Sequence, residues 1–256
     1  MTFSVANLWR HPIKSHGREQ VACALLAAHR PFPFDRRWGV THKSTAPEAA
    51  EAAEGQWVPC RNFMIGTRTP SLAGIWAEFD EASNIITLQH QDIGTVSFNP
   101  DDESDVEHFI QWVTPLYDAQ RTKPVSIVSL PQRAWTDTDF PSVSIMTSAS
   151  HDAVQHATGI NVAPERWRGN IWIDGTSPWE ELEWIGKTLR IGGAKLAIRE
   201  PIVRCPHTQA NPQTGIRDLD TLGTLDKLLG ERVFGVYAEV IKTGQISAGD
   251  CVEVLQ

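Results

Sequence analysis

The sequence predicts a mainly β protein of the α+β class, with a β-barrel and a few peripheral helices. Short segments rich in branched and aromatic residues recur along the whole chain, separated by polar residues and glycine, which is typical of barrels. Segments long enough to form a helix are few. The length of 256 residues, 41% of them hydrophobic, allows one large β-rich domain or two medium ones.

The N-terminal half is expected to begin with a strand and to contain a three-stranded meander. Residues 101–117 are acidic first and amphipathic afterwards, which favours a helix because acidic side chains stabilise the positive end of its dipole. Thr45 and Glu48 have capping-box spacing around an early proline, so a short surface helix or a mobile loop is expected there. Strands are predicted at 3–9, 36–41, 75–79, 85–89 and 95–98.

A second β-rich half is expected to begin near residue 124, so that the chain divides into domains 1–123 and 124–256. Ser148 or Ser150 can cap a helix that runs to Thr158, where a glycine follows. A further helix is predicted at 222–229, and strands are predicted at 125–130, 142–146, 170–174, 188–191, 194–200, 233–242 and 250–255.

The acidic composition argues against some classes of function. The chain has 23 Lys and Arg residues against 31 Asp and Glu residues, a formal net charge of −8. Nucleic-acid binding needs a basic face and is therefore not expected, whereas a small anionic ligand needs only a few local cations. The longest apolar run, 21–28, is much shorter than a membrane span, and no signal peptide is evident. Cytoplasmic residence without membrane contact is expected.

One cysteine is the strongest candidate for a reactive residue. The four cysteines are Cys23, Cys60, Cys205 and Cys251. They form no C-x-x-C motif and are expected to be reduced. Cys205 lies beside Arg204 and two residues before His207, and nearby positive charge favours the thiolate, which attacks electrophiles or binds metals. A buried structural cysteine is the alternative, and a zinc site is less favoured because no second ligand pair has suitable spacing.

Two segments near the N-terminus could bind an anion. Lys14 and Ser15 follow the first predicted strand and offer a charge, a hydroxyl and backbone donors. The alternative is an ordinary basic turn. Arg36 and Arg37 open the next predicted strand, so their side chains should point to opposite faces and one of them can reach a ligand. The alternative is an arginine already paired with Asp35.

A third cationic segment lies in the second half. Arg166 and Arg168 are expected to share one face, which Asn170 continues. The alternative is a basic edge that faces solvent. The sequence contains no P-loop, dinucleotide fingerprint or nucleophile elbow, so none of these motifs identifies the ligand.

Taken together, these segments resemble one family along most of the chain: MOSC domains preceded by the MOSC N-terminal β-barrel domain. LWRHPIKS at 8–15 resembles the family's YPIKS opening, and DRRW at 35–38 matches its DRRW. RWRGN at 166–170 resembles the start of RFRPNIVVDG, and RCPHT at 204–208 resembles RCxxTTVDPDTG. Residues 234–240 resemble the closing strands. The members that the sequence resembles include the mitochondrial amidoxime-reducing component and its bacterial counterparts.

The resemblance implies that the chain binds molybdenum cofactor (Mo-molybdopterin), a phosphate-bearing pterin whose dithiolene holds the metal. In the amidoxime-reducing group a protein cysteine is a molybdenum ligand, and the residue that matches it is Cys205. His207 is a candidate for supplying protons. The positions that match cofactor-binding ones are Lys14, Ser15, Arg36, Thr147, Ser150, Arg168, Asn170, Thr208 and Tyr237.

The implied reaction is the two-electron reduction of N-hydroxylated substrates, such as amidoximes, hydroxylamines and N-hydroxylated bases. The sequence has no cysteine group for an iron–sulfur cluster, no dinucleotide fingerprint and no haem motif. Electrons are therefore expected from a separate ferredoxin-, flavin- or cytochrome-type carrier protein with its NAD(P)H reductase. The carrier could present a basic patch to this acidic chain, or an acidic carrier could bind a local basic patch near Arg36, Arg37, Arg166 and Arg168; the second is favoured.

Two other functions are compatible with the same residues. Cys205 could carry a persulfide and deliver its sulfur to a metal–sulfur centre, because the same thiolate argument applies. The chain could also be a non-catalytic carrier of molybdenum cofactor that uses the same anion contacts without turnover. Molybdenum content, labile sulfur and activity distinguish the three.

Overall fold

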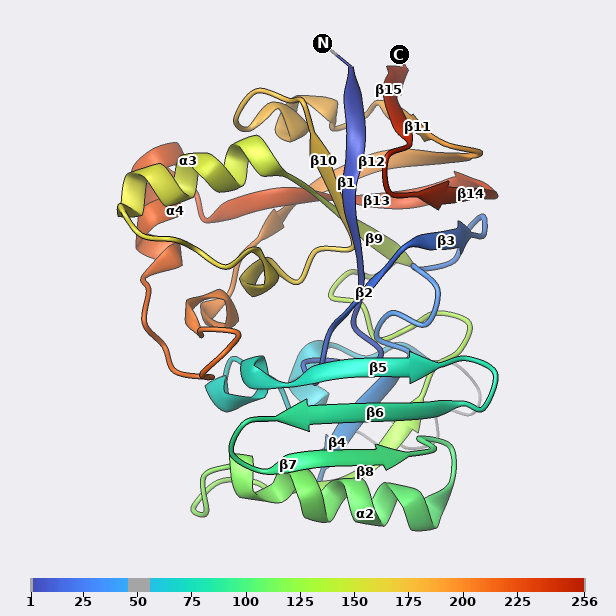
Figure 1. Cartoon of the computed structure of the whole chain (residues 1–256), viewed down its shortest axis with the longest axis vertical. Coiled ribbons are helices and arrows are strands. Elements are labelled where there is room, and N and C mark those ends of the chain that lie inside the picture. Colours follow the sequence, from blue (N-terminus) through green and yellow to red (C-terminus); the bar gives the residue numbers. More distant parts are fainter. Residues whose placement is uncertain (1, 46–55, 256) are drawn as a thin grey trace.

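The computed structural model describes residues 2–45 and 56–255, arranged as a barrel region above a lower region (Figure 1). The stretch predicted as a surface helix or mobile loop after Thr45 lies outside the described residues. None of the described helices is long and apolar enough to cross a membrane.

Seven strands close the barrel within the described residues, which confirms the predicted fold class. Their order is β10-β9-β13-β12-β11-β15-β1, and pairing of β1 with β10 completes the circle. β9 runs parallel to β10, and β13 runs antiparallel to β9. The strands are β1 (Phe3–Arg10), β9 (Ser142–Thr147), β10 (Ile171–Asp174), β11 (Thr188–Ile191), β12 (Ala194–Val203), β13 (Val233–Lys242) and β15 (Cys251–Leu255).

The barrel is filled by side chains that alternate along its strands. Ile171 and Ile173 of β10 are fully buried, as are Val236 and Ala238 of β13. Successive residues of a strand point to opposite faces, so residues two apart share the interior. Because these side chains fill the interior, the barrel is a packed core rather than a channel. Burial of each large aliphatic side chain contributes about 1.5–3 kcal/mol to the free energy of folding.

The structure confirms the predicted three-stranded meander in the lower region. A second hydrophobic core packs against it. α2 (Glu103–Val113) packs along β7 and β8 (Figure 1). Its N-cap is Asp102, whose side chain accepts hydrogen bonds from the backbone of Ser104 and Asp105, as expected for a helix start. The strands are β4 (Trp38–His42), paired with β8 (Pro124–Ser129), and the meander β5 (Trp76–Asp80), β6 (Ile85–His90) and β7 (Gly94–Phe98).

The helix predicted after β9 is present, but its cap is a different residue. α3 (Ser148–Thr158) has Thr147 as its N-cap, and the Thr147 side chain accepts a hydrogen bond from the backbone of Ser150. The prediction of a Ser148 or Ser150 cap is wrong because Thr147 keeps the extended backbone that an N-cap requires, whereas Ser148 is already helical. Gly159 ends the helix in the left-handed conformation, with φ of 69°.

Strand pairing crosses the predicted division at 123/124. β1 comes from the first half of the chain yet forms part of the barrel, and β8 comes from the second half yet pairs with β4.

The sequence analysis did not predict β2 (Glu19–Val21), β3 (Cys23–Leu26) or β14 (Gly244–Ser247). The other helical elements are α4 (Thr221–Leu229), η2 (Cys60–Asn62), η3 (Pro70–Gly74), η4 (Thr114–Leu116), η5 (Pro164–Trp167), η6 (Glu180–Trp184) and η7 (Pro206–Gln209).

Candidate functional site

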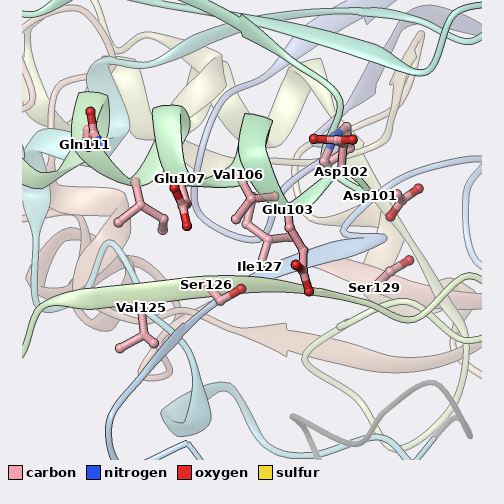
Figure 2. Close-up of a pocket in the computed structure, with 12 residues that line it drawn as sticks. Asp101, Asp102, Glu103, Val106, Glu107, Gln111, Val125, Ser126, Ile127 and Ser129 are labelled. Carbon is pink, nitrogen blue, oxygen red and sulfur yellow. The ribbon is translucent and has the colours of Figure 1, made fainter.

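A cavity of about 550 Å³ between α2 and β8 contains none of the predicted site residues (Figure 2). Asp101, Asp102, Glu103 and Glu107 line it together with apolar side chains. Carboxylates repel an anionic ligand, so this acidic cavity does not suit a phosphate-bearing cofactor.

A second cavity, of about 250 Å³ and here called the site cavity, brings most of the predicted residues together. Side chains from both regions of the fold line it. Lys14, Arg36 and Arg168 reach it together with Cys205, as the sequence predicts. The predicted site residues that line it are Lys14, Ser15, Arg36, Arg168, Cys205, His207, Thr208 and Tyr237.

Lys14 is held at the cavity wall by an ion pair that the sequence analysis missed. Its Nζ donates to the Trp135 carbonyl oxygen at 2.6 Å and to Asp137 Oδ1 at 2.7 Å. Partial burial opposes ionisation of Asp137, whose side chain is 49% exposed, but Lys14 and Arg36 outweigh it and hold the pKa of this carboxyl below its usual value. The carboxylate is therefore ionised and pairs with Lys14 at the cavity wall.

Arg36 is oriented by a buried carboxylate. Asp35 Oδ1 accepts from the backbone N–H of His11 at 2.8 Å and lies 2.9 Å from His11 Nδ1. The other oxygen of Asp35 accepts from Arg36 Nη1, and Arg36 Nη2 donates to the Arg168 carbonyl at 3.1 Å. The alternative of a paired arginine is therefore realised, yet Arg36 still lines the cavity. Burial opposes ionisation of Asp35, but Arg36 and His11 hold its pKa well below its usual range.

Three cavity residues other than glycine have left-handed backbone. Ser15, Arg36 and Arg168 have φ of 64°, 50° and 49°. This conformation costs about 1–2 kcal/mol for a residue with a side chain, and such residues cluster where the surrounding structure holds a functional geometry. The left-handed turns place Lys14–Ser15 and the two arginines against one cavity.

The prediction that Arg166 and Arg168 share one face, which Asn170 continues, is wrong, because Asn170 does not line the site cavity with them. Arg166 ends up inside η5, where its Nη2 donates to Asp218 Oδ1 at 2.6 Å, and β10 begins only at Ile171. Arg168 follows in the left-handed turn, and its Nη1 donates to the Gly17 carbonyl at 3.1 Å. Both still line the site cavity, but each arrives from a turn rather than from one strand face.

Arg168 has donor capacity left for a ligand. Its Nη2 is buried and has no hydrogen-bond partner among the described residues. Burial and the neighbouring Arg36 lower the pKa of Arg168 to about 9, so the guanidinium is still charged at neutral pH. A buried unpaired donor is costly, and an anionic ligand in the cavity would satisfy it.

Three predicted cofactor positions do not line the site cavity. Asn170 lines a small adjoining cavity with Arg36 and Tyr237, and its Oδ1 accepts from the Ser144 hydroxyl at 2.8 Å. The hydroxyls of Thr147 and Ser150 instead donate to Glu181 Oε2 at 2.9 and 2.8 Å. These two side chains are used at the start of α3, because Thr147 is its N-cap.

Cys205 is exposed and therefore is not a buried structural cysteine. The Thr67 hydroxyl donates to its Sγ at 3.6 Å. The Arg204 guanidinium donates to the carbonyls of Trp167 and Phe234, so this arginine braces the backbone beside the thiol. A second thiol, Cys60, lines the same cavity, and burial and Asp137 raise its pKa. No motif surrounds Cys60, and the sequence analysis did not select it.

His207 is a neutral ring pressed against a glycine. Burial and the charge of Arg168 lower the pKa of His207 to about 3. Its Nδ1 is buried without a hydrogen-bond partner in the described part of the chain. A Cβ atom at Gly66 would lie 1.8 Å from that Nδ1, so only glycine at 66 allows the ring its present place.

The expected basic docking patch is not formed by the four predicted arginines. The side chains of Arg36 and Arg166 are only 12% and 2% exposed. Arg37 turns away from the cavity, with its guanidinium over the Trp38 ring and 3.8 Å from Asp101. These arginines pair with residues of the same chain and offer little exposed charge. The prediction of a basic docking patch is therefore wrong.

Two buried histidines are expected to make stability fall at acidic pH. Burial lowers the pKa of His11 to about 3 and that of His16 to about 4. Because these values lie below the unfolded value of about 6.5, the unfolded chain binds protons first. The contribution of each histidine to the free energy of unfolding is complete above the unfolded-state pKa and decreases as pH falls toward the folded-state pKa. The expected loss is about 2 kcal/mol per histidine between pH 7 and pH 5.

Denaturant unfolding at both pH values measures this loss. His16→Gln should reduce the difference by roughly one histidine's share, whereas the same substitution at the exposed His108 should leave it unchanged. Equal stability at pH 7 and pH 5 would contradict the prediction.

Two family models match this chain. A family model described as the MOSC N-terminal beta barrel domain matches residues 2–122, and one described as the MOSC domain matches residues 135–253. The molybdenum cofactor sulfurase of Drosophila melanogaster is 34% identical over 94 residues, 36% of this chain and 12% of that protein. That of Drosophila grimshawi is 36% identical over 98 residues, again 36% and 12%. The matched part of the chain therefore spans 12% of the length of these relatives.

Solved structures with a similar course of the chain include the YUAD protein from Bacillus subtilis. It is 13% identical, with coverage of 99% of this chain and 96% of that chain and a TM-score of 0.47. YiiM from Geobacillus stearothermophilus is 18% identical, with coverage of 44% and 54% and a TM-score of 0.36.

Proposed function

Because this chain belongs to the MOSC proteins that also carry the MOSC N-terminal beta barrel domain, we propose that it binds molybdenum cofactor and reduces N-hydroxylated compounds. The observation that carries the proposal is the meeting of an exposed thiol and several cations in one cavity. Cys205 supplies the thiol, and Lys14, Arg36 and Arg168 supply the charges.

The residues present fit the proposed cofactor. A thiolate is a suitable ligand for a soft-accepting metal, and Cys205 is accessible from the cavity. The unpartnered Nη2 of Arg168 fits an oxygen acceptor. Charge-assisted hydrogen bonds contribute about 1.5–3 kcal/mol each, so Lys14, Arg36 and Arg168 together can hold a phosphate-bearing pterin.

The overall reaction is R–NHOH + 2 e⁻ + 2 H⁺ → R–NH₂ + H₂O. When bound, the molybdenum centre supplies the two-electron reduction. Cys205 would hold the metal, while the cations would bind and orient the anionic part of the cofactor. His207 is proposed to pass a proton through its neutral ring, which lines the site cavity beside Cys205. Burial raises the pKa of Tyr237, so its hydroxyl keeps its proton and can donate a hydrogen bond in the cavity.

The proposed source of electrons is a separate ferredoxin-, flavin- or cytochrome-type protein with its NAD(P)H reductase. The sequence has no dinucleotide fingerprint, haem motif or iron–sulfur cysteine group. The purified protein is therefore expected to reduce an amidoxime with a low-potential dye as donor but not with NADH alone. Product formation measured by chromatography checks this, and rapid NADH-driven turnover by the isolated chain would contradict it.

Sulfur transfer is the second candidate function. The observation that favours it is the pair of thiols, Cys60 and Cys205, in one cavity, together with similarity to proteins named molybdenum cofactor sulfurase over 36% of this chain. In this function Cys205 carries a persulfide. Protein that contains labile sulfur and no molybdenum would favour it, and protein that contains molybdenum but has no reductase activity would indicate a cofactor carrier.

A further inference from the structure

A third cavity, of about 420 Å³, lies beside the site cavity and is rich in arginine. We call it the arginine cavity. Arg68 lies in the loop before η3, Arg121 lies before β8, and Arg217 lies after η7. In Figure 1 the orange loop that follows η7 lies beside the teal turn of η3. Three arginines distant in sequence therefore line one hollow of an otherwise acidic protein.

The positive charge of this cavity is only partly balanced. Asp118 is the one carboxylate among its described lining residues, and it lies 3.7 Å from Arg121 with both side chains more than half exposed. Arg121 also donates to the Arg68 carbonyl at 3.3 Å. The Arg68 guanidinium has no hydrogen bond or ion pair with any described residue. Each guanidinium offers five donors and no acceptor, so the cavity has many more donors than acceptors.

Thr67 separates the arginine cavity from the site cavity and lines both. Its hydroxyl donates to Cys205 Sγ at 3.6 Å, and its carbonyl accepts from Arg217 Nη2 at 2.6 Å. The two cavities are thus one residue apart, and a small molecule that reaches Cys205 can extend toward the arginines.

The loop before Arg217 is closely packed against Ser71, which lines the arginine cavity. Gly215 has φ of 69°, and a Cβ atom there would lie 2.5 Å from the Cα of Ser71. The loop that carries Arg217 is thereby held against η3. The Arg217 guanidinium, which also donates to the Thr67 carbonyl, is therefore held in place before a ligand arrives, which lowers the entropic cost of binding.

We propose that the arginine cavity is a subsite for an oxyanion, a carboxylate or phosphate group carried by the substrate that reacts in the site cavity. Planar guanidinium groups bind both anions with paired hydrogen bonds. A lining of three arginines with the hydroxyl-bearing Thr67, Thr69 and Ser71 suits such a group. The assignment of the anion to a substrate rests on the proposed function, whereas the binding of an oxyanion does not.

The first test titrates the full chain with inorganic phosphate and follows the arginine Nε–Hε signals by NMR. The Arg68 and Arg121 signals, assigned from single Arg→Gln variants, should shift and saturate. Loss of one charge-assisted hydrogen bond weakens binding about tenfold or more, so Arg68→Gln with Arg121→Gln should weaken phosphate binding there by at least this factor. Arg61→Gln, an exposed arginine outside both cavities, is the matched control. Signals that do not saturate, or an equal effect of Arg61→Gln, would overturn the subsite.

The second test compares an aryl amidoxime that bears a carboxylate with its neutral methyl ester. In the Arg68→Gln, Arg121→Gln variant, the ratio of kcat/KM for the acid to that for the ester should fall about tenfold, and Arg61→Gln should leave the ratio unchanged. Saturable phosphate binding with an unaltered ratio would overturn the assignment to substrate, and would point to an acidic protein or an extended cofactor instead. Absence of turnover with both amidoximes would refute the proposed function, while the phosphate titration still decides the subsite.

Discussion

Cys205→Ser is expected to abolish the reduction of N-hydroxylated substrates while the protein remains folded. A serine hydroxyl is a much poorer ligand than a thiolate for this metal. Loss of an outer-shell partner of a metal already costs 10–100-fold, so loss of the ligand itself should reduce kcat by about 100-fold or more. The thiol is exposed, with one contact from Thr67, and its replacement leaves no gap in a core.

The matched control is Cys23→Ser, which changes an exposed thiol on β3 outside the site cavity. It should retain wild-type turnover with a dye as donor. Circular dichroism and thermal unfolding establish that both variants are folded. Unchanged turnover in folded Cys205→Ser protein would refute the role of Cys205 as a metal ligand.

Lys14→Met is expected to have the second large effect, loss of bound cofactor. Methionine replaces the length of the side chain but removes the charge and the donors that face the site cavity. Asp137, the partner of Lys14, is 49% exposed, so its carboxylate can be solvated in the variant and the fold should persist. Cofactor content should fall about tenfold or more, the change expected for one lost charge-assisted hydrogen bond.

Lys187→Met removes an exposed lysine outside the site cavity and serves as the control. Both variants are purified from a host that makes molybdenum cofactor, and pterin is released and quantified by fluorescence. Equal pterin content in the Lys14 variant, the Lys187 variant and the wild type would show that Lys14 does not hold the cofactor.

Long barrel strands could be predicted from the sequence because their pattern is periodic. β13 was expected at 233–242 and is found at Val233–Lys242, and the meander of β5, β6 and β7 is also present. β2, β3 and β14 have only three or four residues. Such segments are too short to show an alternation that distinguishes a strand from a loop.

The site was predictable where a motif marks it and not elsewhere. Lys14, Arg36 and Cys205 lie in motifs and meet in one cavity. Asp137 lies in a loop and Cys60 begins η2, both in segments without a distinctive pattern, and they enter the cavity through tertiary packing alone. The spacing of residues in the sequence also does not predict which way a side chain points after a turn.

Two arginines show that side-chain direction could not be predicted from the sequence. Arg168 follows η5 in a left-handed turn, which strand periodicity does not predict. Arg37 leaves the cavity to stack over Trp38 and approach Asp101. Counting local positive charge therefore overestimated the docking patch, because it takes no account of which guanidinium groups are buried and paired.

The molybdenum content of the wild-type chain tests the central claim most directly. The protein is purified from a host that makes the cofactor, and molybdenum is measured by mass spectrometry alongside released pterin and labile sulfur. The account predicts molybdenum and pterin in near-equimolar amounts with the protein. Folded protein free of molybdenum and pterin, with or without labile sulfur on Cys205, would contradict it.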